Sequence, residues 1–258
     1  YPVVTKSARL VQKGDQKIRL ENVMSAAVEF PDMDYEMIHL SGAWARERYV
    51  KTRKLEMGTQ AVQSLAGTGS SSEQNPFIAL KRPHTTEDTG EVFGFSFVYS
   101  GNFLAQVEVS TYEMTRVMMG INPEVVMVYS DKGLNGMSQA YHRLYRDRLM
   151  RGKWRNHARP ILLNNWEATY FDFDEEKILN IAKKAKEVGV ELFVLDDGWF
   201  GTRNDDYQGL GDWFVNKNKL PNGISGLSRK IDLRLWILFM IPSPRLSRNL
   251  PFPTLNGI

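Results

Sequence analysis

The sequence predicts a β-sandwich followed by an α/β unit with parallel strands. Two observations carry this prediction. Residues 1–135 contain short segments in which apolar and polar residues alternate, and turn-forming residues separate these segments. After Pro160 the pattern changes to short apolar runs on either side of a long amphipathic segment. Alternation with period two is typical of strands with one buried face, whereas two strands joined by a helix lie parallel.

The composition is that of a folded protein with one large core or two smaller ones. The chain has 258 residues, of which 42% are hydrophobic, and its formal net charge is +3. This composition excludes an intrinsically disordered chain. No window approaches the roughly 18 consecutive apolar residues of a membrane-spanning helix. The charge is too small to indicate nucleic acid, and the absence of cysteine excludes a disulfide framework. We therefore expect neither a nucleic-acid nor a membrane partner.

Four segments of the first half show the strand pattern: Lys17–Val23, Glu91–Tyr99, Leu104–Val109 and Val125–Tyr129. They are rich in Val, Phe and Tyr, and Gly, Asn and Pro lie between them. Such spacing is typical of an antiparallel sandwich. The stretch Gly67–Ser72 predicts a flexible loop, because it lacks the Lys-Ser or Lys-Thr of a phosphate-binding loop.

A helix is predicted over Met137–Met150, where apolar residues recur at helical spacing and the charged residues Arg143, Arg146, Asp147 and Arg148 fall outside the apolar stripe. We interpret this segment as an amphipathic linker helix with a basic, solvated outer face. An interaction surface on that face is the alternative.

The segment after Pro160 predicts a strand, a helix and a second strand. The strands are Ile161–Leu163 and Leu192–Leu195, and the helix is Glu175–Val188. Asp174 is placed to cap the start of the helix, and Gly189 is placed to end it. We expect the two strands to be parallel and buried.

Polar and aromatic residues follow both of these strands. In α/β folds, ligands bind at the carboxyl ends of the strands. Two adjacent carboxylates accept hydrogen bonds from several hydroxyl groups, and a tryptophan offers a flat apolar face to a sugar ring. We therefore interpret the cluster as a monosaccharide pocket formed by Asp196, Asp197, Trp166, Trp199 and Trp213.

Two other uses of these residues are open. Asp197 is also placed to cap a helix, and the tryptophans are equally suited to core packing. Metal coordination would join Asp196 and Asp197 to Asp205 and Asp206. Hard cations need several oxygens in one tight loop, and residues 198–204 separate these pairs, so no metal site is predicted.

Longer motifs in both halves resemble the bacterial-type α-galactosidases of glycoside hydrolase family 36. In the second half they are LNNWEATYFDF (163–173), VLDDGWFGTR (194–203), LGDWFVN (210–216) and LPNGI (220–224). In the first half they are HLSGAWARER (39–48), QNPFIAL (74–80) and GEVFGFSFVYSGNF (90–103). The similarity extends from about residue 1 to about residue 231.

The resemblance implies a β-sandwich followed by a (β/α)8 TIM barrel that releases terminal α-galactose from oligosaccharides such as melibiose and raffinose. It implies that Asp196 and Asp197 bind galactose hydroxyls and that Trp166 lines the pocket. Trp199 and Trp236 are further candidates for substrate contact. The resemblance also implies no cofactor, a homo-oligomer that is a tetramer, and a cytoplasmic location.

The catalytic residues of the family have no counterpart here. A retaining glycosidase uses a nucleophile and an acid/base carboxyl about 5–5.5 Å apart. The family carries its nucleophile in a Lys-Trp-Asp motif, whereas Arg155 follows Lys153 and Trp154 in this chain. We therefore expect a truncated multidomain protein that is inactive alone.

Four parts are predicted: a partial sandwich domain (1–135), a linker helix (136–159), the start of the catalytic barrel (160–231) and an aberrant tail (232–258). The tail is assigned because it lacks the two glutamates of the family's Trp-Phe-Glu-Pro-Glu motif.

Two classes of function fit these observations. The first is a glycosidase of the α-galactosidase type seen as a fragment, with a transferase or an α-N-acetylgalactosaminidase as close variants. The second is a non-catalytic galactose-binding or assembly module built from the sandwich and the two aspartates.

Overall fold

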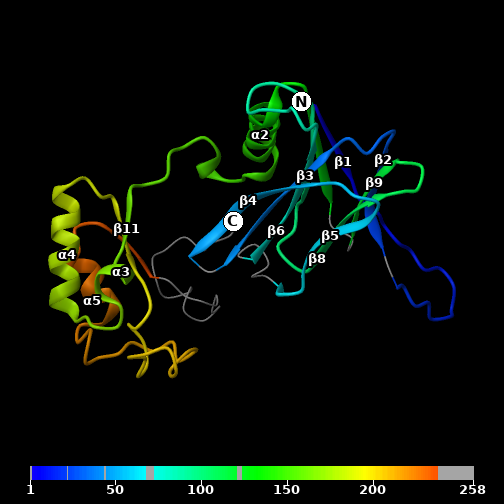
Figure 1. Cartoon of the computed structure of the whole chain (residues 1–258). Coiled ribbons are helices and arrows are strands. Elements are labelled where there is room, and N and C mark those ends of the chain that lie inside the picture. Colours follow the sequence, from blue (N-terminus) through cyan, green and yellow to red (C-terminus); the bar gives the residue numbers. More distant parts are fainter. Residues whose placement is uncertain (1, 22, 44, 68–72, 121–123, 238–258) are drawn as a thin grey trace. The chain divides into compact units, whose positions relative to one another are not determined.

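The computed structural model describes residues 2–21, 23–43, 45–67, 73–120 and 124–237. The chain divides into two compact units, Tyr1–Leu149 and Met150–Ile258. The first unit consists mainly of strands, and the second contains helices and a small sheet (Figure 1).

The first unit is a sandwich of two antiparallel sheets. One sheet has six strands in the order β1-β10-β7-β6-β3-β4, and the other has four in the order β2-β9-β8-β5. The strands are β1 (Val3–Lys6), β2 (Met24–Phe30), β3 (Glu36–Ala43), β4 (Arg46–Lys54), β5 (Gly58–Ser64), β6 (Gln74–Lys81), β7 (Val92–Phe97), β8 (Phe103–Val109), β9 (Thr115–Gly120) and β10 (Val125–Ser130).

Alternating side chains of these strands divide between two cores. Ile78 and Leu80 of β6 point into the core between the two sheets, where Phe103 and Val107 of β8 meet them. Ala79, between the two β6 residues, belongs to a second core on the other face of the six-stranded sheet. Because both faces of the six-stranded sheet are covered here, consecutive residues of β6 are buried, whereas β8 has one buried face and shows the period-two pattern.

The second core lies beneath helix α2 (Gly133–Leu144), which continues as a π-helical turn (Tyr145–Leu149). Met137 and Tyr141 of α2 pack on Val126 and Val128 of β10. The Tyr141 hydroxyl donates a hydrogen bond to the backbone oxygen of Val126 at 3.0 Å. The α-helix therefore begins and ends earlier than predicted, and its apolar side chains pack on the six-stranded sheet.

One predicted strand of the first half is wrong. Residues 17–21 have no regular secondary structure, and β2 begins only at Met24. Ile18 and Leu20 supply the alternating pattern, but both are more than half exposed. None of the segments that the structure describes forms a second layer over them, so the alternation has no buried face to match. The predicted loop at 67–72 lies outside the described residues except for Gly67.

The second unit contains a parallel sheet in the order β11-β12-β13. Its strands are β11 (Leu162–Asn164), β12 (Leu192–Leu195) and β13 (Arg234–Ile237). Its helices are α3 (Trp166–Thr169), α4 (Glu175–Glu187) and α5 (Gly223–Lys230), and a 3-10 turn covers Lys153–Arg155. One core cluster joins the sheet, α4 and α5.

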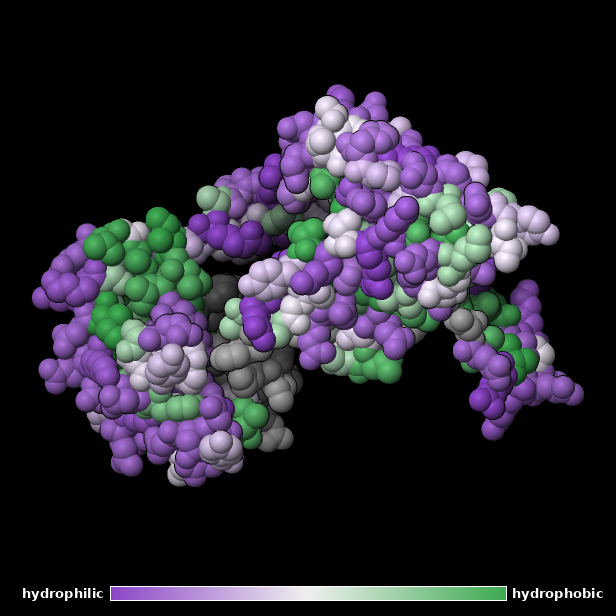
Figure 2. Space-filling model, in the orientation of Figure 1, coloured by the Kyte–Doolittle hydropathy of each residue, from purple (hydrophilic) through white to green (hydrophobic). Residues whose placement is uncertain are grey.

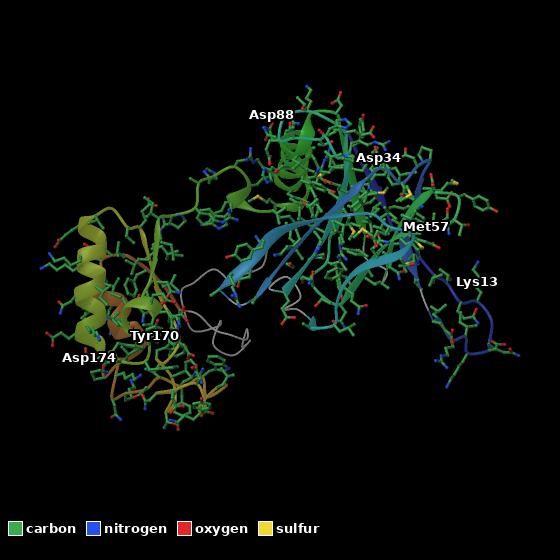
Figure 3. All side chains as sticks on the ribbon, in the orientation of Figure 1. Lys13, Asp34, Met57, Asp88, Tyr170 and Asp174 are labelled. Atoms are coloured by element: carbon green, nitrogen blue, oxygen red, sulfur yellow. The ribbon has the colours of Figure 1, made fainter. Side chains whose placement is uncertain are left out.

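The capping signals around α4 are confirmed. The side chain of Asp174 accepts a hydrogen bond from the backbone N–H of Lys177 at 2.8 Å, which caps the helix. Gly189, with φ at 89°, follows the helix in a left-handed conformation. Figure 3 labels Asp174 where α4 begins and Tyr170 nearby in the same unit.

The predicted aberrant tail contains a strand of this sheet. Arg234–Ile237 pairs in parallel with β12, and the side chain of Leu235 is buried in the core of the unit. Residues 234–237 therefore belong to the sheet, because an apolar strand gains burial there. Residues 238–258 lie outside the described residues.

Apolar side chains gather on the surface of the second unit where β11 begins and α4 ends (Figure 2). Ile161, Leu162 and Val188 are each more than half exposed there. β11 is an edge strand of the described sheet, and no further strand of that sheet covers its outer side. The exposed apolar patch lies at this uncovered edge. No helix among the described residues is long and apolar enough to cross a membrane.

Candidate functional site

Asn165 joins the carboxyl ends of β11 and β12. The two strands pair in parallel with Asn164 opposite Val194, so the residues that follow them are neighbours. The Asn165 side chain has no exposed surface. Its Oδ1 accepts a hydrogen bond from the backbone N–H of Asp196 at 2.9 Å, and its Nδ2 donates to the hydroxyl of Thr169 at 2.9 Å. The two strand ends are thereby fixed to each other.

The carboxylate of Asp196 is held from two sides and stays partly exposed. Asn164 Nδ2 donates a hydrogen bond to Asp196 Oδ2, and the backbone N–H of Asp197 donates to Oδ1 at 2.8 Å. Asn164 is itself fixed, because its Oδ1 accepts from the backbone N–H of Trp166 at 2.8 Å. A carboxylate has about four lone-pair positions, so Asp196 keeps free acceptor positions on its exposed side.

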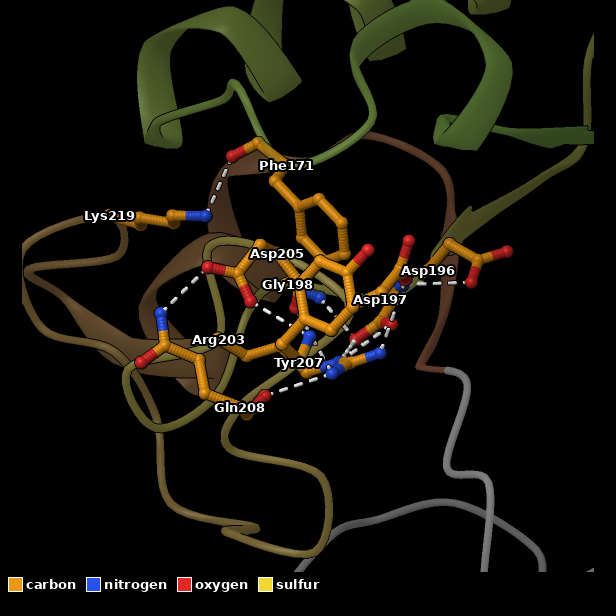
Figure 4. A network of polar contacts seen from close by, with 10 residues as sticks. Phe171, Asp196, Asp197, Gly198, Arg203, Asp205, Tyr207, Gln208 and Lys219 are labelled. Carbon is orange, nitrogen blue, oxygen red and sulfur yellow. Dashed lines mark hydrogen bonds and ion pairs between the residues drawn. The ribbon is translucent and has the colours of Figure 1, made fainter.

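Asp197 forms a buried ion pair with Arg203 (Figure 4). Arg203 Nε donates to the two carboxylate oxygens of Asp197 at 2.7 and 2.8 Å. The backbone N–H of Gly198 donates to Oδ1 at 2.7 Å. Asp197 is 8% exposed and Arg203 is 4% exposed, so solvent screens this pair little.

The rest of the Arg203 guanidinium binds the loop that follows. Nη1 donates to the backbone oxygens of Asp205 at 3.1 Å and Gln208 at 2.9 Å. The guanidinium carbon lies 5.5 Å from the centroid of the Phe171 ring. The pKa of Arg203 lies above its usual value, first because of the hydrogen bond to Asp197. Arg203 therefore stays charged and orders this loop around Asp197.

The sequence motifs contain Arg203 and Asn165, but sequence reasoning assigned neither of them a role. A charge argument finds Arg203, because a buried aspartate needs a cation and Arg203 is the next basic residue in the chain. The local pattern gives no comparable signal for Asn165, whose role depends on its burial.

The tryptophans that were predicted to contact the sugar differ in burial and in the side chains around them. Trp166 is partly buried beside the strand ends, and its ring packs edge-on against Tyr170 and Phe171 with centroids 5.3 and 5.0 Å away. Trp199 is 1% exposed and lies in the core of the unit. This burial agrees with the core-packing alternative, and the substrate contact of Trp199 remains a prediction.

Trp213 and Trp236 lie elsewhere in the unit. The ring of Trp213 packs on Trp199 and Phe200, with centroids 6.4 and 4.5 Å away, and is partly buried. Trp236 lies in β13 opposite Val194, and its side chain lies outside the described part of the structure.

Lys219 supports the segment that follows α3. Its Nζ donates to the backbone oxygen of Phe171 at 2.7 Å (Figure 4). The same atom lies 4.7 Å from the centroid of the Phe173 ring. Burial lowers the pKa of Lys219, and the charges of Asp172 and Asp197 oppose this effect. The lysine thus holds the loop that carries the Phe171 ring near Arg203.

No group of three or more His, Asp or Glu side chains in the described ranges could hold a metal ion. The carboxylates that the metal alternative needs have other partners. Asp205 accepts hydrogen bonds from the backbone N–H of Tyr207 and from the Gln208 side chain, and Asp206 pairs with Arg203 at 3.6 Å.

Two family models match the chain. The model of the glycosyl hydrolase family 36 N-terminal domain matches residues 1–128, and the melibiase model matches residues 121–240. The second match continues past residue 231, where the similarity was expected to end. It includes β13, which agrees with the place of this strand in the sheet.

Similar proteins include alpha-galactosidase AgaA of Geobacillus stearothermophilus, 55% identical over 95% of this chain and 36% of its own length. Alpha-galactosidase 1 of Pediococcus pentosaceus is 46% identical over 87% of this chain and 33% of its own length. The crystal structure of AgaA matches with a TM-score of 0.86 and 54% identity, over 92% of this chain and 36% of that one.

The alpha-galactosidase structure from Lactobacillus brevis matches with a TM-score of 0.80 and 42% identity, over 84% of this chain and 32% of that one. The chain thus spans about a third of the length of the relatives it matches. Its two family models together reach from residue 1 to residue 240, and both halves of its fold superimpose on those relatives. The chain therefore belongs to glycoside hydrolase family 36.

Proposed function

We propose that this chain provides the galactose-binding side of an α-galactosidase active site. The observation that carries the proposal is the pair Asp196 and Asp197 at the carboxyl end of β12, each fixed by partners of its own. Similar structures from G. stearothermophilus were solved in complex with raffinose and with stachyose. Terminal α-galactosides are therefore the proposed substrate class.

The geometry of the strand ends suits a neutral sugar. Asp196 is partly exposed next to Asp197 in the chain, and the partly buried Trp166 begins α3 directly after the neighbouring strand end. Hydroxyl groups would donate to the carboxylates, while the C–H face of the sugar packs on an aromatic ring.

We also propose that the chain alone does not hydrolyse α-galactosides. Hydrolysis with retention needs a nucleophile and an acid/base carboxyl about 5–5.5 Å apart. The resemblance places the nucleophile in the Lys-Trp-Asp motif of a later barrel strand, which this sequence lacks, and the acid/base on a strand beyond that one. Asp196 and Asp197 are assigned to binding because their oxygens already accept hydrogen bonds from Asn164 and Arg203.

Calorimetric titration of the 258-residue chain with galactose tests the binding proposal. We expect Asp196→Asn to weaken galactose binding at least tenfold, because a carboxylate accepts stronger hydrogen bonds than an amide. Glu176→Gln is the matched control, since Glu176 is exposed on α4. Equal affinity for glucose and galactose, or no binding at all, would contradict the proposal.

Incubation with p-nitrophenyl α-galactoside tests the second proposal. We expect no turnover above the rate without protein, and turnover by the purified chain would refute the proposed absence of activity.

The family resemblance also supports a homo-oligomeric state, a cytoplasmic location and domain boundaries near residues 135 and 159, which we propose on that basis. Size-exclusion chromatography with light scattering tests the oligomeric state, and limited proteolysis tests the boundaries.

A further inference from the structure

Arg203 contacts Asp197 and the loop after β12 at once. Its Nε binds both carboxylate oxygens, and its Nη1 binds the backbone oxygens of Asp205 and Gln208. These contacts fix the guanidinium from the opposite side to Asp197 (Figure 4). A planar guanidinium fixed in this way dictates where its carboxylate partner lies.

The orientation of Asp197 decides whether it acts together with Asp196. Neighbouring side chains point to opposite faces within a strand, so the two carboxylates need a bend after β12 to reach one ligand. Gly198, with φ at 86°, provides this bend, and its backbone N–H donates to Asp197 Oδ1. Arg203 and Gly198 together occupy part of the acceptor positions of Asp197 and leave the rest free.

Burial makes this arrangement dependent on Arg203. A carboxylate that is 8% exposed needs a compensating cation. In the described part of the chain, Arg203 is the one basic residue in an ion pair with Asp197. Asp205 and Asp206 interact electrostatically with Arg203. Lys219 interacts electrostatically with Asp172 and Asp197.

We infer that Arg203 is a positioning residue of the sugar site, which orients the Asp197 carboxylate so that it accepts hydroxyl groups of the same sugar as Asp196. This inference rests on the proposed galactose-binding function. Arg203 itself contacts no sugar, because its described contacts are with the carboxylate and the loop behind it.

The test compares Arg203→Gln, which removes the charge, with Arg203→Lys, which keeps it. Amide hydrogen exchange measured by NMR on the 258-residue chain reports the orientation of Asp197, because the Gly198 N–H is protected by Asp197 Oδ1. The Asp196 N–H is the internal control, since Asn165 protects it independently of Arg203. Arg229→Gln is the matched control variant, because Arg229 is exposed on α5.

We expect Arg203→Gln to speed exchange at Gly198 at least tenfold while Asp196 is unchanged, and to weaken galactose binding at least tenfold. Arg203→Lys should recover part of both effects. Faster exchange at both amides would show a general structural role and overturn the inference, as would unchanged exchange at Gly198 or unchanged galactose affinity in Arg203→Gln.

The outcomes separate the inference from the proposed function. A wild-type chain that does not bind galactose contradicts the proposed function, whereas the exchange at Gly198 still decides whether Arg203 orients Asp197. If Arg203→Gln does not fold, the comparison is made with Arg203→Lys, for which unchanged exchange and unchanged affinity would overturn the inference.

Discussion

Replacing Asn165 with alanine removes the side chain that joins the ends of β11 and β12. Asn165 is fully buried, and its amide makes two hydrogen bonds, one with the Asp196 backbone and one with Thr169. The Thr169 hydroxyl keeps a partner in the backbone oxygen of residue 165 at 3.1 Å, whereas the Asp196 N–H loses its partner. An unsatisfied buried donor costs about 1–3 kcal/mol, and the small cavity adds about 1 kcal/mol. We expect a loss of about 2–4 kcal/mol in the free energy of unfolding.

Urea denaturation followed by tryptophan fluorescence measures this loss. Five of the six tryptophans lie after Met150, so fluorescence reports mainly the second unit. With a urea dependence of about 2 kcal/mol per M, the midpoint should fall by about 1–2 M. Asn218→Ala is the control, because Asn218 is exposed and its replacement should change the free energy by no more than about 0.5 kcal/mol. Equal midpoints for the two variants would refute the reasoning.

Three further predictions concern the same unit. Gly198→Ala should lower the free energy of unfolding by about 1–3 kcal/mol, because φ is 86° and the new Cβ would lie 2.9 Å from a neighbouring ring; an unchanged melting temperature would contradict this. The pKa of Glu175 lies below its usual value, first because Lys230 donates a hydrogen bond to it, so its stabilising effect is complete above about pH 4.3 and is lost as pH falls. Glu175→Gln should therefore flatten the stability profile below that pH, and parallel profiles of wild type and variant would speak against it. Trp166→Ala should weaken galactose binding about tenfold in calorimetric titration, provided that the ring packs on the sugar, and equal affinities would exclude that contact.

Predictions from the local sequence were correct where the structure of a segment depends only on residues close to it in the chain. Asp174 and Gly189 mark the ends of α4 because capping depends on residues within one turn. The strand predicted from the alternation of residues 17–23 was wrong, because a strand also needs a covering layer and Ile18 is exposed. The sequence pattern placed Arg234–Ile237 in the predicted tail, because the burial of Leu235 depends on pairing with β12, which the local sequence does not show.

The candidate site shows the same division between local and tertiary information. Asp196 and Asp197 were predicted as neighbours at a strand end, because chain order alone places them there. The structure distinguishes them, since Asp197 is buried against Arg203 while Asp196 is partly exposed. Trp199 belongs to the core because of the path of the chain after β12, which no spacing of residues reveals.

The sequence by itself determined the two kinds of architecture, the ends of the long helix of the second unit and the family to which the motifs point. These properties depend on periodicity, capping and contiguous motifs, which are local. Only the tertiary structure decided which carboxylate is paired, which tryptophan is buried and that Asn165 joins two strand ends. The physical reason is that burial and ion pairing depend on how segments distant in the chain pack together, and a buried polar group takes whichever partner that packing brings within hydrogen-bond distance.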